Sequence, residues 1–398
     1  MSYFLLARFG ARATPCFPVK RIAFVSSLLG LGVALVSPCA HAVEAHSTVK
    51  MLPSANGRAA IAYDRTTYRI TQYLEHPYAF PSAGVSSRNF AFDSYPGVRV
   101  GATPGTWFGN QAPTLVEYVQ GTNIVHTQRT VSGVTLDEYV FAPITLDDNV
   151  AITLVKATRT SGTGNVDVYQ LFNYHLGTGS PAPGTDNENI TYDGSRDTFY
   201  ESGPAGVTFS HGSINASTKH SCTPDNPYAL LTAGSDLTNN AGTGGATNDA
   251  VPGFQTSVGN LAVGASAWAG FYSAVALDSN GAAESDKVRA WINGRSPDVI
   301  LAAEMAAWNG WITAAPKNAS AMEAALHKAS QVVLRGAQVT EAGNANGQIL
   351  ASLPPGHWNI SWVRDMAYAT VGLVRSGHYA EAKGALRFQL NATANNYQ

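Results

Sequence analysis

The chain has 398 residues, a length that suits two domains, or one large domain with part of another. Charged residues make up 13% of the chain and the formal net charge is -2, so there is no basic field to attract nucleic acid or an anionic membrane. A neutral partner such as a sugar suits this charge better. The small charged fraction and the abundance of Gly, Ser, Thr and Asn are typical of extracellular all-β domains.

The first 42 residues have the pattern of an export signal. Lys20 and Arg21 precede an apolar run over 22–37, which is followed by an Ala-x-Ala site at 40–42. We predict cleavage after Ala42 and a secreted or periplasmic mature protein. A membrane-spanning anchor is the alternative, but the sixteen apolar or small residues of this run fall short of the roughly 20 needed to cross a bilayer.

The cysteine pattern excludes a disulfide framework. Cys16 and Cys39 would leave with the signal, so the mature chain keeps Cys222 and has no internal disulfide. Cys222 lies in a turn-rich stretch without a base close by in sequence, and we interpret it as incidental rather than as a nucleophile.

Residues 43–284 are predicted to form a β-sandwich domain. Period-two stretches bounded by Gly, Asn, Asp and Pro recur over about 49–277. One of them, 130–141, predicts a hairpin that turns near residues 132–133. Short strands without helical patterns between them indicate a large antiparallel sandwich, and the Gly-, Asn- and Thr-rich stretch 234–253 predicts a long surface loop.

The pattern becomes helical after Leu277. Residues 285–318 are predicted to be a helical linker, whose main helix starts at Pro297 with Ser296 as its cap and ends near Ile312. Residues 319–398 are predicted to hold three further helices. These cover 320–336, opened by a Ser320–Glu323 capping box, then about 363–375, and finally a segment from Tyr379 past Leu390.

These last helices need neighbours. Met322, Leu326, Ala329 and Val333, for example, recur at helical spacing and form an apolar stripe. Because such a helix gains most of its stability by packing that stripe, two or three of them cannot close a domain. We therefore expect an all-α domain that is incomplete in this chain.

The segment with the clearest chemistry covers residues 347–365. Trp358 and Trp362 offer aromatic faces that can cover the apolar side of a sugar ring. Arg364 can donate several hydrogen bonds in a fixed fork, and Asp365 can accept from two hydroxyls. The residues alone leave another interpretation open, in which the indoles are core and the charges are a pair at a helix start.

This segment resembles the first signature of glycoside hydrolase family 15, the glucoamylases and glucodextranases. A Gly-x-Ile-x-Ala-Ser run precedes a Trp-x-Arg-Asp run, and the matching residues are Gly347, Ile349, Ala351, Ser352, Trp362, Arg364 and Asp365. The resemblance implies a mainly β N-terminal supersandwich followed by the start of an all-α (α/α)6 barrel. It also implies an inverting, exo-acting α-glucosidase that releases glucose from the non-reducing ends of α-glucans.

The resemblance also implies roles for particular residues. Arg364 and Asp365 correspond to the pair that holds the non-reducing-end glucose, Trp362 to a wall of that pocket, and Trp358 to a position that is usually tyrosine. An inverting glycosidase needs a general acid and a general base, which are later glutamates in this family. We expect them C-terminal of Gln398, so that no catalytic residue lies in this chain and it is inactive alone. Glu381 is expected to pack or face solvent.

Two other functions remain open. One is a disaccharide phosphorylase or trehalase-type enzyme with a similar layout, and the other is a non-catalytic carbohydrate-binding protein, which exposed coplanar aromatics on one sheet would support. We expect a monomer that binds an α-glucan or oligosaccharide, without a cofactor; structural calcium is left open, although no specific motif supports it. The acidic stretches 147–149 and 186–188 lack calcium-loop spacing and are interpreted as turns, and the histidines lack metal-ligand spacing.

Overall fold

The computed structural model describes residues 49–74, 89–177, 186–356 and 360–392. The predicted export signal, with Cys16 and Cys39, lies outside these residues, as does Trp358. All described residues belong to one compact unit. In these ranges we find no helix that is both long and apolar enough to cross a membrane.

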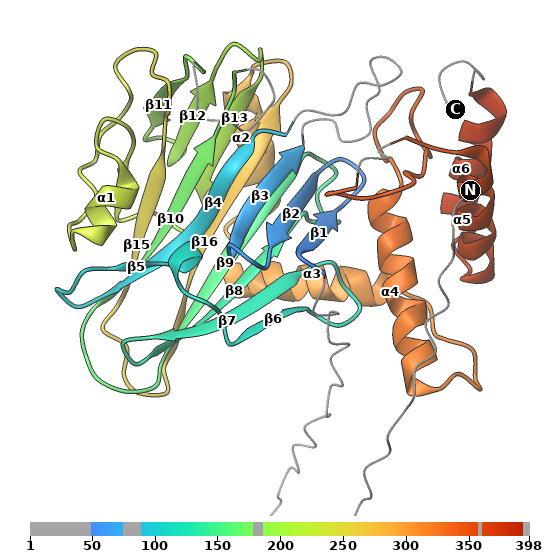
Figure 1. The fold of residues 1–398 in the computed structure, drawn as a ribbon, viewed down its shortest axis with the longest axis horizontal. Coiled ribbons are helices and arrows are strands. Elements are labelled where there is room, and N and C mark those ends of the chain that lie inside the picture. The colour runs from blue at the N-terminus through green and yellow to red at the C-terminus, as the bar shows by residue number, and fades with distance from the viewer. Residues whose placement is uncertain (1–48, 75–88, 178–185, 357–359, 393–398) are drawn as a thin grey trace, which may run out of the picture. The chain divides into compact units, whose positions relative to one another are not determined.

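Two antiparallel sheets account for most of the chain (Figure 1). The first, sheet A, has the order β1-β2-β3-β4-β10-β15-β14, with β5 paired to β4; the second, sheet B, has the order β11-β12-β13-β16-β9-β8-β7-β6. The prediction of a large antiparallel sandwich is confirmed. The strands of sheet A are β1 Met51–Ala55, β2 Ala60–Asp64, β3 Arg69–Leu74, β4 Ala91–Val100, β5 Thr106–Trp107, β10 Val166–Tyr174, β14 Lys219–Ser221 and β15 Gly253–Gly259. Those of sheet B are β6 Leu115–Tyr118, β7 Val125–Val131, β8 Val134–Phe141, β9 Val150–Arg159, β11 Asn189–Asp193, β12 Thr198–Ser202, β13 Thr208–Ser213 and β16 Ser266–Ala276.

The predicted hairpin joins β7 to β8. Ser132 and Gly133 both have positive φ, 47° and 73°, as a two-residue hairpin turn with the twist of its strands requires. A Cβ at Gly133 would lie 2.4 Å from the carbonyl oxygen of Ser161, so this position also needs glycine for space.

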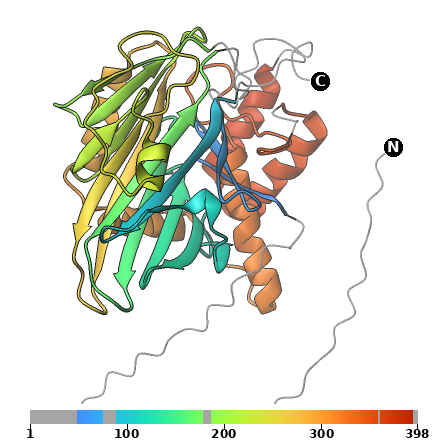
Figure 2. The ribbon, with the colours of Figure 1, turned by 60° about the vertical axis from the view of Figure 1, so that its left-hand side comes forward.

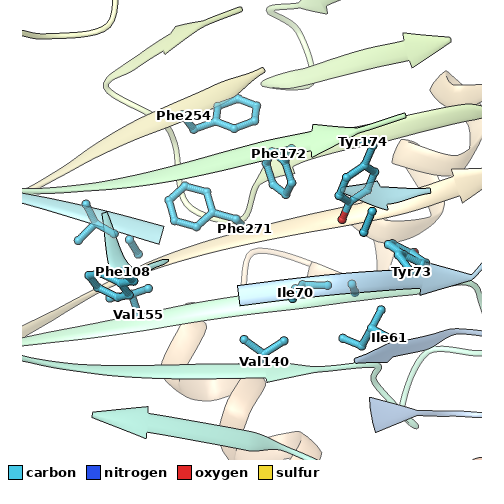
Figure 3. Packing of buried hydrophobic residues seen from close by; sticks show 14 of the residues in the cluster. Ile61, Ile70, Tyr73, Phe108, Val140, Val155, Phe172, Tyr174, Phe254 and Phe271 are labelled. Atoms are coloured by element: carbon cyan, nitrogen blue, oxygen red, sulfur yellow. The ribbon is translucent and has the colours of Figure 1, made fainter. Parts of the chain in front are cut away.

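The main core lies between the two sheets (Figure 3). Aromatic rings from both sheets meet there edge to face, with the Tyr73 and Phe209 ring centres 5.2 Å apart and those of Tyr174 and Phe209 4.8 Å apart. The Tyr73 hydroxyl donates to the carbonyl oxygens of Asn149 and Ser273, which satisfies a polar group that packing buries.

Three helices pack on the outer faces of the sheets. The short helix α1 (Pro227–Thr232) covers part of sheet A, where Leu231 joins a cluster with Trp107 and Tyr169; Figure 2 shows it in front of the strands. Helices α2 (Gly281–Ile292) and α3 (Pro297–Trp311) pack on sheet B. The sequence patterns missed α1, and α2 spans the predicted boundary between sandwich and linker at 284/285.

Helix α3 is tied to the sandwich by a buried carboxylate. Glu304 accepts hydrogen bonds from the backbone N–H groups of Ile144 and Thr145 and from the Thr145 hydroxyl. Ser296 occupies the N-cap position of α3, as predicted; its hydroxyl donates to Asp298 and accepts no capping hydrogen bond from the backbone. The start of α3 is therefore set by Pro297 at its first position.

Three more helices follow, namely α4 (Ala321–Ala337), α5 (Val363–Arg375) and α6 (Tyr379–Asn391). The predicted capping box of α4 is present, with Ser320 and Glu323 bonded reciprocally. Buried residues of the three helices, among them Met366, Leu373 and Phe388, form a separate small core.

Candidate functional site

The first half of the signature is built into the structure. Residues 347–352 run beside the end of α4, where Ile349 pairs with Gln338 and the N–H of Leu350 donates to the Ala337 carbonyl at 3.0 Å. Ile349 and Leu350 are buried in the helical core. This half of the motif therefore serves to position the chain that follows it.

Gly347 has a structural requirement of its own. Its φ is +89°, and a Cβ there would lie 2.3 Å from the carbonyl oxygen of Gly384 in α6. The signature glycine thus lets this segment approach the backbone of α6, which a side chain would prevent.

The second half of the signature opens α5. Trp362 occupies the N-cap position in an extended conformation and is half-buried, and Arg364 and Asp365 lie in the first helical turn. Below them, Met366 is buried in the helical core, and the Gln389 side chain of α6 donates to the Val363 carbonyl at 3.1 Å. These two contacts fix the first turn of α5, which carries Arg364 and Asp365, against the helical core and α6.

Arg364 and Asp365 are exposed to solvent. The Arg364 Nε lies 3.6 Å from Asp365 Oδ1, and the two side chains are 81% and 42% exposed. Such an exposed pair contributes little to stability, although Asp365 is favourably placed at a helix N-terminus. Arg364 and Asp365 thus lie side by side at the start of α5, and in the described part of the chain their charged groups are paired with each other.

A polar cluster behind this segment was not foreseen. The Trp311 ring of α3 stacks on His378 with centres 3.8 Å apart, and its Nε1 donates to Glu381 at 3.0 Å. Gln331 of α4 accepts from His378 and from Thr313. Burial lowers the pKa of His378, which favours a neutral ring. Glu381 has the packing role expected for it, and the cluster joins α3, α4 and α6.

The sandwich contains a buried group that could hold a metal. Atoms of His175, Asp186 and Glu188 that can act as ligands all lie within 4.8 Å of one another. The interpretation of 186–188 as a plain turn is wrong for the two acids, because both carboxylates are buried. The other acidic stretch behaves as a surface element, where Asp147 pairs with Arg58.

Cys222 is a free, buried cysteine. Burial, with a smaller effect from Asp225, raises the pKa of its thiol to about 12. A thiol that stays protonated at neutral pH is a poor nucleophile, in agreement with an incidental role.

Comparison with known proteins shows the class of fold. No protein-family model matches the chain, and no curated protein matches it. Among solved structures, a bacterial glucoamylase complexed with acarbose matches with a TM-score of 0.58 and 12% identity over 84% of this chain. A putative kojibiose phosphorylase from the human microbiome gives 0.40 and 8% over 72% of this chain and 38% of its own.

The likeness to the glucoamylase shows the fold. The chain has a two-sheet antiparallel supersandwich followed by helices of the glucoamylase type, and the predicted fold class is confirmed. It covers 48% of that glucoamylase, about half its length. Membership of glycoside hydrolase family 15 stays a prediction.

Proposed function

We propose that this chain is part of a secreted, exo-acting, inverting α-glucosidase of the glucoamylase type that releases glucose from the non-reducing ends of α-glucans. The observation that carries the proposal is the exposed Arg364–Asp365 pair on the first turn of α5, in a chain with a glucoamylase-like fold. The match to a glucoamylase complexed with acarbose supports a sugar as the ligand.

In this proposal the pair binds the terminal glucose. The Arg364 guanidinium donates to hydroxyl oxygens of one ring, and the Asp365 carboxylate accepts from its hydroxyl hydrogens. Trp362, at the start of the same helix, places an indole beside the apolar face of the ring, and Trp358 is proposed to add a second aromatic surface. These groups bind and orient the substrate, and none of them transfers a proton.

The acid and base of the reaction are proposed to lie C-terminal of Gln398. An inverting enzyme holds its two carboxyl groups roughly 6.5 to 9.5 Å apart, on opposite faces of the sugar. In helices α4 to α6 the glutamates are Glu323, which is engaged in the α4 capping box, and Glu381, which accepts the bond from Trp311. The present chain alone is therefore expected not to hydrolyse glycosides.

The exposed aromatics of the sandwich do not favour a non-catalytic carbohydrate-binding protein. In the described part of the sandwich, the exposed aromatic side chains are Phe92 and Tyr228. Phe92 packs against the His175 ring, and Tyr228 stacks on the Trp107 ring. Each ring is engaged with its own neighbour, so these two do not provide the flat aromatic platform that such a function requires.

The proposal is tested by measuring glucose release from maltose, isomaltose, trehalose and soluble starch with the full-length parent protein, following the anomer by NMR. We expect β-glucose, and a loss of at least about 100-fold in kcat/KM for Asp365→Ala, because the substrate would lose charge-assisted hydrogen bonds. Asp298→Ala is the matched control, since Asp298 is also an acidic residue in a first helical turn, that of α3.

Three results would contradict the proposal. Strict dependence on inorganic phosphate would indicate a disaccharide phosphorylase, and release of α-glucose would exclude inversion. Full activity of Asp365→Ala would remove the assigned binding pair. The relative rates on the four substrates would show which glycosidic linkage the enzyme prefers.

Export is proposed from residues 1–42. Expression in a Gram-negative host followed by N-terminal sequencing should give a mature chain that starts at Val43 and is found in the periplasm or medium. Retention of the intact N-terminus in the membrane fraction would indicate an anchor instead.

A further inference from the structure

A buried histidine and two buried carboxylates meet where the two sheets are connected. His175 follows β10 of sheet A directly, and Asp186 and Glu188 precede β11 of sheet B. Their side chains are buried, and their candidate ligand atoms lie within 4.8 Å of one another. The three side chains, all from the connection between β10 and β11, thus converge on one small volume.

The hydrogen bonds orient these groups but leave ligand capacity unused. The His175 Nδ1 lies 2.6 Å from Asp186 Oδ2, and the Glu188 oxygens accept from the N–H groups of Leu176 and Ala250 at 2.7 and 3.0 Å. Each carboxylate oxygen has a second lone pair. The Nε2 of His175 is buried and has no hydrogen-bond partner within the described ranges.

The ring of His175 faces Asp186 with its Nδ1. An ion held by His175, Asp186 and Glu188 together takes the Nδ1 lone pair in place of this hydrogen bond, because Nε2 lies on the far side of the ring from Asp186. Asp93, on the neighbouring strand β4, also has a buried Oδ1 that is unpaired in the described part of the chain.

The charge around the cluster favours a cation. Two carboxylates, those of Asp186 and Glu188, lie within 4.8 Å of one another in a buried volume, where two negative charges are costly without a cation. Arg69 is a nearby cation, and it is already paired with Asp93. A divalent ion would compensate the excess negative charge at this point.

A glycine allows the close approach of the acid. A Cβ at Gly177 would lie 2.0 Å from Asp186 Oδ1. Because no side chain fits there, the position keeps the Asp186 carboxylate close to the backbone beside His175.

The geometry points to a site for one divalent transition-metal ion, held by His175, Asp186 and Glu188. One imidazole nitrogen with two carboxylates is a donor set that suits Zn²⁺ or Mn²⁺, whereas Ca²⁺ takes six to eight oxygen ligands. The ion would connect the end of β10 to the start of β11, and thereby sheet A to sheet B. The role is structural and is independent of the proposed glycosidase activity.

A second buried pair provides a matched control. His211 and Glu201 are fully buried and 2.8 Å apart, and the other ring nitrogen of His211 is bonded to Ser273. Both ring nitrogens are therefore occupied, and this pair is not part of a metal-binding group among the described residues.

The test uses the whole chain, purified without added chelator. We expect about one equivalent of Zn²⁺ or Mn²⁺ by mass spectrometry, a lower Tm after EDTA, and its recovery with Zn²⁺ or Mn²⁺ but not with Ca²⁺. Asp186→Asn keeps the shape of the side chain and should weaken Zn²⁺ binding at least about tenfold, and His175→Ala should abolish it. His211→Asn should leave the metal content unchanged.

The proposal fails if the purified chain holds no stoichiometric metal and Zn²⁺ leaves its Tm unchanged. Equal metal binding by Asp186→Asn and wild type would place the ion elsewhere. Recovery by Ca²⁺ as efficient as by Zn²⁺ would contradict the assignment to a transition metal. If His175→Ala does not fold, Asp186→Asn still decides the outcome.

Discussion

The sandwich and the α4–α6 helices treat their apolar side chains differently. The sandwich buries apolar residues between its sheets and again beneath α1, α2 and α3. The three later helices share a small core but expose ten large apolar side chains: Met322, Leu326, Val333, Val363, Tyr368, Val371, Val374, Tyr379, Leu386 and Leu390. The helical spacing of apolar residues therefore predicts that a helix forms, whereas the burial of those residues depends on which elements pack against the helix.

The polar groups differ in the same way. In the sandwich, some charges are buried and paired, as are those of Arg129 and Glu138. At the start of α5 the charged pair is open to solvent. A substitution should therefore damage stability in the first region and ligand binding in the second.

The largest effect is expected for Arg129→Met. Arg129 is completely buried, bonds Glu138 at 3.1 Å and stacks its guanidinium 4.0 Å from the Phe108 ring centre. Removing it leaves the Glu138 charge unpaired inside the sandwich, at a cost of about 3–5 kcal/mol in the free energy of unfolding measured with urea. Arg364→Met should cost less than about 1 kcal/mol. Equal losses of unfolding free energy in the two variants would show that the charges of the sandwich and of α5 do not differ in their contribution to stability.

The second effect depends on pH. Burial raises the pKa of Glu201 well above its ordinary value, so the folded state keeps a proton that the unfolded state releases. Its contribution to stability is complete below about pH 4.5 and is lost as pH rises towards the folded pKa. Glu201→Gln should therefore gain on the wild type by about 1.4 kcal/mol per pH unit as the pH rises above about 4.5.

Urea unfolding of both proteins across this pH range measures the effect. Glu117→Gln, a partly exposed position in the edge strand β6, is the control and should follow the wild type. A constant difference between Glu201→Gln and wild type would show that Glu201 is ionised in the folded state.

A third effect concerns the signature glycine. Gly347→Ala forces a side chain against the backbone of α6 and into an unfavourable φ, so we expect a loss of about 1–3 kcal/mol. Gly343→Ala has a similar φ of +119° but nothing within 4 Å of its Cβ, so it tests backbone strain alone. Equal losses for the two variants would indicate that the contact with Gly384 is unimportant.

The smallest expected effect compares alanine substitutions on the buried and the exposed side of α4. Val332 is 8% exposed and Leu326 is 64% exposed. Val332→Ala should cost about 1–2 kcal/mol, and Leu326→Ala less than about 0.5 kcal/mol, by the same urea assay. A larger loss for Leu326→Ala would mean that another surface covers this side of α4 in solution.

Local signals predicted much of the fold. The two-residue turn at Ser132 and Gly133, the Ser320–Glu323 capping box and Pro297 each fix backbone geometry within a few residues, so their elements were found where expected. Helix α1 was missed because six residues carry too little periodic signal. Ser296 was found at the N-cap of α3, although its hydroxyl donates to Asp298 and makes no capping bond.

The sequence named the residues of the candidate sugar site but did not predict their exposure or the contacts that support them. The sequence placed Arg364 and Asp365 at the start of a helix, because capping and helical spacing are local properties. Their exposure, and the support of Val363 by Gln389, depend on how α6 packs against α5. Gly347 matched the signature, yet its contact with Gly384 is a tertiary one.

By itself, the sequence determined the strand-rich and helical parts and most helix boundaries, since each follows from periodicity and local chemistry, and it supplied the residues of the proposed sugar-binding motif. Only the tertiary structure decided which strands pair, which helix faces are covered, and that His175 lies beside Asp186 and Glu188. The physical reason is that burial and charge environment depend on how the elements and their connections pack, which neither periodicity nor local turn chemistry encodes.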